Sequence, residues 1–131
     1  MSKDNLRIPH FIDHILQAIK RISRYAQGLD EAAFLANDEK QDAVIRNIEI
    51  IGEAARNIER NYPDFAAQHQ EIPWTDIYLM RNRLSHGYFS VDMELVWKTV
   101  QQDIPGLEKQ ILHLRQNLEN EGDQDRVEPI S

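Results

Sequence analysis

The chain contains no cysteine among its 131 residues. This absence excludes disulfide scaffolds, thiol nucleophiles, zinc sites built on thiolates, and iron–sulfur clusters. No apolar run approaches the roughly 18 to 20 residues that are needed to cross a bilayer, and the first ten residues lack the apolar segment of a signal peptide. We therefore expect a cytoplasmic protein without a membrane partner.

Basic side chains are fewer than acidic ones, 15 against 22, and the formal net charge is −7. A uniformly acidic surface would repel the phosphates of nucleic acids. Five of the acids, however, lie between Glu119 and Ser131, where the only base is Arg126. With 41% hydrophobic residues in the chain, we predict one domain over residues 1–118 and an acidic, disordered tail over residues 119–131.

Apolar residues recur with the period of an α-helix in four long segments. These segments span about 9–25, 38–61, 73–86 and 90–118. Gly87 is the expected stop of the third helix, and Pro105 should kink or divide the fourth. A short helix is possible at 64–68, and no segment alternates with period two. The pattern predicts an all-α, up-and-down bundle of four long helices, the last one kinked at Pro105.

Gly52 lies inside the second predicted helix. Glycine costs a helix about 1 kcal/mol relative to alanine, so its presence there favours a close crossing with another helix.

The densest group of functional side chains runs from Arg81 to Tyr88. Arginine offers a permanent charge and planar donors for phosphate, and histidine exchanges a proton near neutral pH. Residues five apart lie about 140° apart around an ideal helix, so Arg81 and His86 meet only if the helix ends near the histidine. The pair would then suit phosphodiester chemistry without a metal. The structural alternative is that His86 merely terminates a turn.

In that alternative, Arg81 pairs with a carboxylate of a neighbouring helix, such as Glu49 or Glu53. These two acids lie one helical turn apart and could also bind magnesium or act as acid and base, but we expect them to support Arg81 through a salt bridge. His10 and His14 have the spacing of a metal-binding pair, yet no third ligand accompanies them. We therefore predict no metal site.

Several ordered motifs extend beyond this segment. They are His14-Ile15-Leu16, Ile48-Glu49-Ile50-Ile51-Gly52-Glu53-Ala54-Ala55, Ile72-Pro73-Trp74, the signature Arg-x-x-x-x-His-x-Tyr at Arg81, His86 and Tyr88, then Val91-Asp92, Trp97 and Asp103-Ile104-Pro105. Together they cover most of residues 6–115. By these motifs the chain resembles the HepT-like group of the HEPN superfamily, the toxin halves of HepT/MntA toxin–antitoxin pairs.

The resemblance implies a toxin that acts as a metal-independent endoribonuclease without a cofactor. The resemblance also implies a homodimer. Arg81 and His86 of both protomers would line one cleft between them. The ribose 2′-hydroxyl of an RNA, such as a tRNA or an mRNA, would attack the adjacent phosphate. His86 would move the proton, and Arg81 would stabilise the charge of the transition state. Two histidines related by a two-fold axis could divide the roles of base and acid.

Tyr88 has a separate implied role. By the resemblance, it is the residue to which an MntA-like nucleotidyltransferase antitoxin transfers AMP, and the added bulk and charge would block RNA. The alternative is an aromatic side chain with its hydroxyl at the bundle surface.

Arg83 could contribute to phosphate binding or simply face solvent. Asn82 could orient His86 or the substrate, or only bond at the helix surface.

Two other functions remain open at this point. The chain could be a non-catalytic HEPN accessory subunit that binds nucleotide or RNA for a partner nucleotidyltransferase, or a purely structural helical dimer. The acidic balance favours a specific RNA over indiscriminate binding, because a broad basic face is missing.

Overall fold

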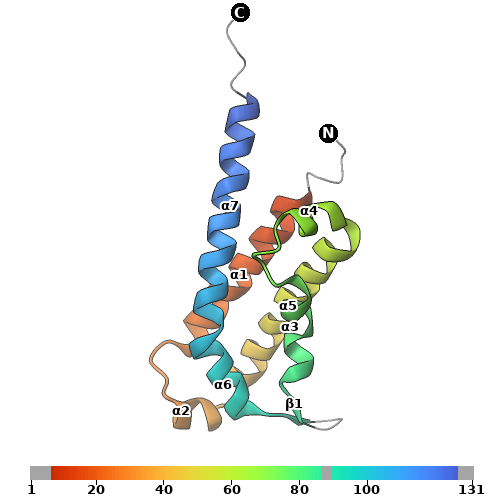
Figure 1. Cartoon of the computed structure of the whole chain (residues 1–131). Coiled ribbons are helices and arrows are strands. Elements are labelled where there is room, and N and C mark those ends of the chain that lie inside the picture. Colours follow the sequence, from red (N-terminus) through yellow and green to blue (C-terminus); the bar gives the residue numbers. More distant parts are fainter. Residues whose placement is uncertain (1–6, 87–89, 127–131) are drawn as a thin grey trace, which may run out of the picture.

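The computed structural model describes residues 7–86 and 90–126, with the backbone alone at His86 and from residue 122 onward, and it is a helical bundle (Figure 1). The elements are α1 (Ile8–Ala26), α2 (Glu31–Leu35), α3 (Asp38–Asn61), α4 (Pro63–Gln68), α5 (Trp74–Arg83), β1 (Ser85–His86), β2 (Ser90–Val91), α6 (Met93–Gln102) and α7 (Ile104–Arg126). The predicted all-α bundle is confirmed. Within the described ranges, no helix is long and apolar enough to cross a membrane.

Helices α1 and α3 form the centre of the core, and isoleucine dominates their contact. Their fully buried isoleucines are Ile12, Ile15, Ile19, Ile22, Ile48, Ile51 and Ile58. Helix α7 packs against α1 through Ile111 and Leu114. At the edge of that contact the Nε of Arg115 donates to Oδ1 of Asp13 at 2.5 Å, and this hydrogen bond raises the pKa of Arg115.

Local signals in the sequence explain most helix ends. The side chain of Asn37 accepts a hydrogen bond from the Lys40 amide at 3.0 Å and caps α3. Gly28 follows α1 with φ at 78°, a left-handed conformation that glycine adopts without strain. The short helix expected at 64–68 is present as α4.

Helix α2 was not predicted, because five residues are too few to show a helical period. Its carbonyl end is closed by Gln41, whose Nε2 donates to the carbonyls of Phe34 and Leu35, each at 3.0 Å. Phe34 is fully buried and stacks against Trp97 of α6, with 5.2 Å between ring centroids. Tertiary packing therefore stabilises this short element.

The fourth predicted helix is divided rather than kinked. Helix α6 ends at Gln102 and α7 begins at Ile104, so Pro105 occupies the first turn of α7, where its missing amide proton costs no helical hydrogen bond. Helix α7 then continues to Arg126. Residues 119–126, which we assigned to a disordered tail, form the last turns of α7. The domain boundary at 118 stays a prediction.

The third helix was predicted to run to Gly87, but it ends at Arg83. Instead, Ser85 pairs with Val91 and His86 with Ser90 in a two-stranded antiparallel hairpin. The amide of Asp92 donates to the carbonyl of Leu84 at 2.8 Å, which closes the base of this hairpin.

The prediction that the fourth helix begins near Ser90 was also wrong. The side chain of Asp92 accepts from the Leu95 amide at 3.1 Å and starts α6 at Met93 instead. Each strand of the preceding hairpin has only two residues. Strands this short cannot show the alternation of apolar and polar residues from which a strand is predicted.

Helices α3 and α5 pack tightly against each other at Gly52. A Cβ atom at this position would lie 3.3 Å from the carbonyl oxygen of Tyr78 and 3.5 Å from that of Ile77. Both are backbone atoms, which cannot rotate away. The close crossing predicted from Gly52 is therefore confirmed.

We expect Gly52→Val to lower the free energy of unfolding by about 2 kcal/mol, because the larger side chain would push α5 away from α3. Urea unfolding followed by circular dichroism measures the change. Gly106→Val is the matched control, since a Cβ atom at Gly106 meets nothing within 4 Å. An equal loss in both variants would assign the effect to valine in a helix and not to the crossing.

Candidate active site

Three side-chain contacts cross between α3 and α5, and we call the surface along them the α3–α5 seam. They are Glu59 Oε2 to Thr75 Oγ1 at 2.5 Å, the Arg56 guanidinium carbon to the Tyr78 ring centroid at 4.8 Å, and Glu49 Oε2 to Arg81 Nε at 3.6 Å. From the first contact to the third, the residue numbers fall along α3 and rise along α5, so the two helices run antiparallel. The seam thus presents two parallel rows of side chains, with Arg81 at one end.

Arg81 is held at that end from two sides. Its Nη1 donates a hydrogen bond to Oγ of Ser85 at 2.7 Å, and its Nε faces the carboxylate of Glu49. In the described part of the chain, neither Nε nor Nη2 makes a hydrogen bond within the usual distance. The side chain keeps 32% of its surface exposed. The guanidinium is therefore fixed in place and still accessible to an anion such as a phosphate.

The two candidate carboxylates differ in their contacts. Glu49 forms the salt bridge predicted for Arg81 and also lies 4.0 Å from Arg46. Glu53, one turn further along α3, is exposed and does not contact Arg81. Glu49 is therefore the residue that supports Arg81.

His86 follows Ser85 directly in β1, so its backbone belongs to the hairpin and not to α5. The angular separation expected on a continuous helix therefore does not apply to this pair. The His86 side chain, Gly87 and Tyr88 lie outside the described residues. The roles predicted for His86 and Tyr88 stay predictions.

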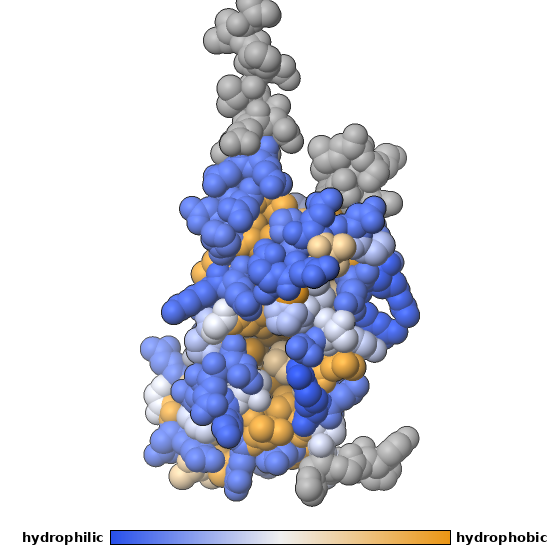
Figure 2. Space-filling view, in the orientation of Figure 1, coloured by the Kyte–Doolittle hydropathy of each residue, from blue (hydrophilic) through white to orange (hydrophobic). Residues whose placement is uncertain are grey.

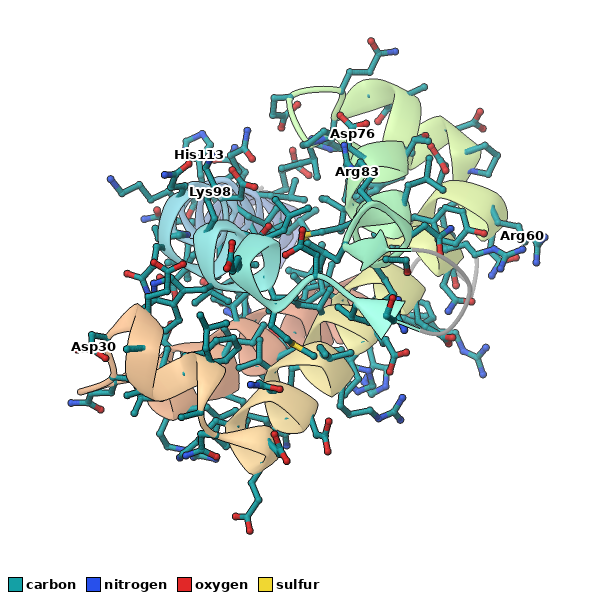
Figure 3. All side chains as sticks on the ribbon, turned by 90° about the horizontal axis from the view of Figure 1, so that it is seen from below. Asp30, Arg60, Asp76, Arg83, Lys98 and His113 are labelled. Atoms are coloured by element: carbon teal, nitrogen blue, oxygen red, sulfur yellow. The ribbon has the colours of Figure 1, made fainter. Side chains whose placement is uncertain are left out.

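Arg83 points away from Arg81. Its Nη2 donates to the backbone carbonyl of Asp76 at 2.5 Å, and its Nη1 lies 3.7 Å from the Asp76 carboxylate. Figure 3 shows this pair together on one side of α5. Asn82 is exposed on the helix surface. The substrate contacts predicted for Asn82 and Arg83 stay predictions.

A groove of about 700 Å³ lies on the Arg83 side of α5, between this helix and the α6–α7 pair. Figure 2 shows hydrophobic residues in this hollow. Ile77, Met80 and Leu107 form part of its wall, whereas Arg81 is not among the lining residues. The groove and the α3–α5 seam are thus separate surfaces on two sides of one helix.

The remaining histidines do not form a metal centre in the described ranges. The rings of His10 and His14 lie 4.2 Å apart on α1, and no group of three His, Asp or Glu side chains there could hold an ion. His69 instead stacks on Phe65, at 4.4 Å between centroids.

Two features of the site were not predicted from the sequence. Ser85 was not considered, although it lies four residues after Arg81 and could have been expected on the same side of the chain. The Arg56–Tyr78 pair had no local signal, since the two residues belong to different helices and meet only through tertiary packing.

A sequence model of the family described as "Ribonuclease HepT-like" matches residues 15–114. The chain belongs to the HepT-like ribonuclease family of the HEPN superfamily. Membership confirms the resemblance found in the sequence motifs and supports ribonuclease activity.

Named relatives agree with this assignment. The chain is 42% identical to a "Probable ribonuclease HepT" of Thermococcus cleftensis over 105 residues, which cover 80% of this chain and 93% of the relative. It is 34% identical to a "Putative RNase" of Caldanaerobacter subterraneus, over 81% of this chain and 92% of the relative.

A two-part protein of Methanocaldococcus jannaschii, "Gamma-glutamylcyclotransferase and putative RNase", is 39% identical over 91% of this chain, which spans 51% of that protein. No solved structure matches the chain at a significant level.

We expect Glu49→Ala to lower the rate of RNA cleavage by this HepT-like chain about tenfold or more, because Arg81 would lose the group that positions it. Single-turnover cleavage of a labelled RNA measures the effect. Glu53→Ala removes the same charge one turn away and should cleave at nearly the wild-type rate. Equal losses in the two variants would show that net charge, and not the position of Arg81, sets the rate.

Proposed function

We propose that this HepT-like chain is a toxin and a metal-independent endoribonuclease that cleaves RNA in a cleft between two copies. Membership of the family supports the ribonuclease activity. The observation that carries the finer proposal is Arg81, which Glu49 and Ser85 hold in place next to the hairpin backbone of His86. Arg81 is then a fixed cation for a phosphate. His86, which could carry a proton, is the residue after Ser85, and Ser85 helps to orient Arg81.

The proposed reaction is an intramolecular transesterification at the phosphorus. The 2′-oxygen of a ribose attacks the adjacent phosphorus, and the bond from phosphorus to the 5′-oxygen of the next nucleotide breaks. One His86 accepts the proton of the 2′-hydroxyl, and a protonated His86 of a second copy donates a proton to the leaving 5′-oxygen. The products are a 2′,3′-cyclic phosphate and a 5′-hydroxyl.

Arg81 acts on the charge that develops during this transfer. Negative charge builds on the non-bridging oxygens of phosphorus in the transition state, and a guanidinium fixed beforehand stabilises it without reorganising. The Nε of Arg81 is buried and faces Glu49, and Nη1 donates to Ser85, so we assign Nη2 to the phosphate.

The proposed dimer rests on the family resemblance and on the need for a second group that transfers a proton. The attacking and leaving oxygens lie on opposite sides of the phosphorus, so one imidazole cannot readily serve both in one step. Two copies related by a two-fold axis place the same residue on both sides.

Control by AMP transfer completes the proposal. Tyr88 follows His86 by two residues, so an AMP group on its hydroxyl would add bulk and negative charge beside the catalytic histidine and repel RNA. The proposed donor enzyme is an MntA-like nucleotidyltransferase.

We expect the purified protein to cleave RNA in excess EDTA, to leave DNA of the same sequence intact, and to produce 2′,3′-cyclic phosphate ends that mass spectrometry detects. Arg81→Ala and His86→Ala should each lower the rate about 100-fold or more, because each removes a group that acts only in the transition state. Circular dichroism checks that both variants keep the wild-type fold.

Retained cleavage in both variants would remove the catalytic assignment. If the wild-type protein cleaves no RNA but stimulates a nucleotidyltransferase partner, the chain is the non-catalytic accessory subunit instead.

Coexpression with an MntA-like nucleotidyltransferase should add the mass of AMP to the wild-type chain and should abolish cleavage. We expect Tyr88→Phe to gain no AMP and to remain active in the presence of the partner, since the acceptor hydroxyl is gone. Peptide mass spectrometry locates the modified residue. AMP on another tyrosine, such as Tyr78, would contradict the role of Tyr88.

A further inference from the structure

The α3–α5 seam contains a second arginine, next to the end at which Arg81 lies. Arg56 of α3 lies over the ring of Tyr78, 4.8 Å from its centroid. Tyr78 and Arg81 are three residues apart and share one face of α5; at 1.5 Å per residue, they are separated by about 4.5 Å along the helix axis. The Arg56–Tyr78 pair is therefore close enough to Arg81 to contact a nucleotide whose phosphate binds there.

The two side chains of this pair differ in exposure. Arg56 is exposed and Tyr78 is half-buried, so the aromatic ring supports the guanidinium from the protein side. Gly52 fixes their separation, because it lets the backbone of Tyr78 approach α3. The guanidinium of Arg56 lies over the Tyr78 ring, and because Arg56 is exposed, its side away from the ring is open to solvent. Nucleic-acid bases stack on guanidinium planes as they do on aromatic rings.

We propose that the Arg56–Tyr78 pair is a stacking platform for the base of the nucleotide next to the scissile phosphate. This inference rests on the proposed function, in which Arg81 binds that phosphate, and it adds a second substrate contact on single-stranded RNA. The platform binds any base through its flat face, so it contributes affinity and position and not sequence recognition.

The charges along the seam favour stacking over phosphate binding as the main contribution. Glu49 is paired with Arg81 and Arg46, and Glu59 accepts a hydrogen bond from Thr75. Glu53 is exposed between Glu49 and Arg56. Because acids alternate with the arginines here, the surface lacks the concentrated positive charge that binds a phosphate backbone by itself.

The test is the affinity of a short single-stranded RNA in the His86→Ala background, which keeps the RNA intact. Fluorescence anisotropy should show about tenfold weaker binding for Arg56→Ala, the loss of roughly one stacked base. Lys98→Ala is the control. Lys98 is exposed on α6 and, in Figure 3, lies on the opposite side of the bundle from Arg60, the arginine one turn beyond Arg56. This variant loses the same charge and should bind like the parent.

An oligomer of equal length in which every nucleotide is abasic separates stacking from charge. The parent should prefer the base-bearing RNA, and Arg56→Ala should lose about tenfold of that preference. Arg56→Lys should behave like Arg56→Ala, because lysine keeps the charge without the plane.

Three results would overturn the platform. They are an unchanged preference for bases in Arg56→Ala, full affinity in Arg56→Lys, or a change in the sedimenting mass of Arg56→Ala, which would make the seam an interface between copies. These binding results do not depend on cleavage. A wild-type protein that binds RNA through the pair but cleaves none would refute the proposed function and leave the platform standing.

Discussion

The missing side chain at Gly52 lets the backbone of α5 lie against α3, with a Cβ position only 3.3 Å from the Tyr78 carbonyl. Gly52 lies between Glu49 and Arg56, the α3 residues of two contacts in the α3–α5 seam. Glu49 reaches Arg81 and Arg56 reaches Tyr78 because the two helix axes are close enough for side chains to meet across them. A glycine that weakens its own helix is thus the residue that positions the candidate active site.

The ion pair of Arg81 does not compete with a catalytic role for this residue. Its partner Glu49 is 3.6 Å from Nε, and both side chains are partly exposed. An ion pair of this kind contributes at most about 1 kcal/mol, because water screens the charges. A phosphate that approaches from solvent can therefore bind the same guanidinium. The salt bridge of Arg81 with Glu49 is therefore compatible with a catalytic role for Arg81.

An acidic chain can act on RNA when its positive charge is local and fixed. The formal net charge is −7, yet Arg81 and Arg56 both lie on the α3–α5 seam. In the proposed function, weak general attraction would limit binding to RNA that fits the seam, and one oriented guanidinium would supply the charge needed in the transition state.

The helical bundle, the close crossing at Gly52 and the family could be predicted from the sequence, because helical periodicity, a glycine inside a helix and ordered motifs are local properties. It could not locate the end of α5 at Arg83, where a hydrogen bond from Asp92 to Leu84 competes with the next helical turn. Nor could it choose Glu49 over Glu53 or pair Arg56 with Tyr78, because both depend on how two helices rotate and pack. Only the tertiary structure decides which side chains from distant segments share a surface.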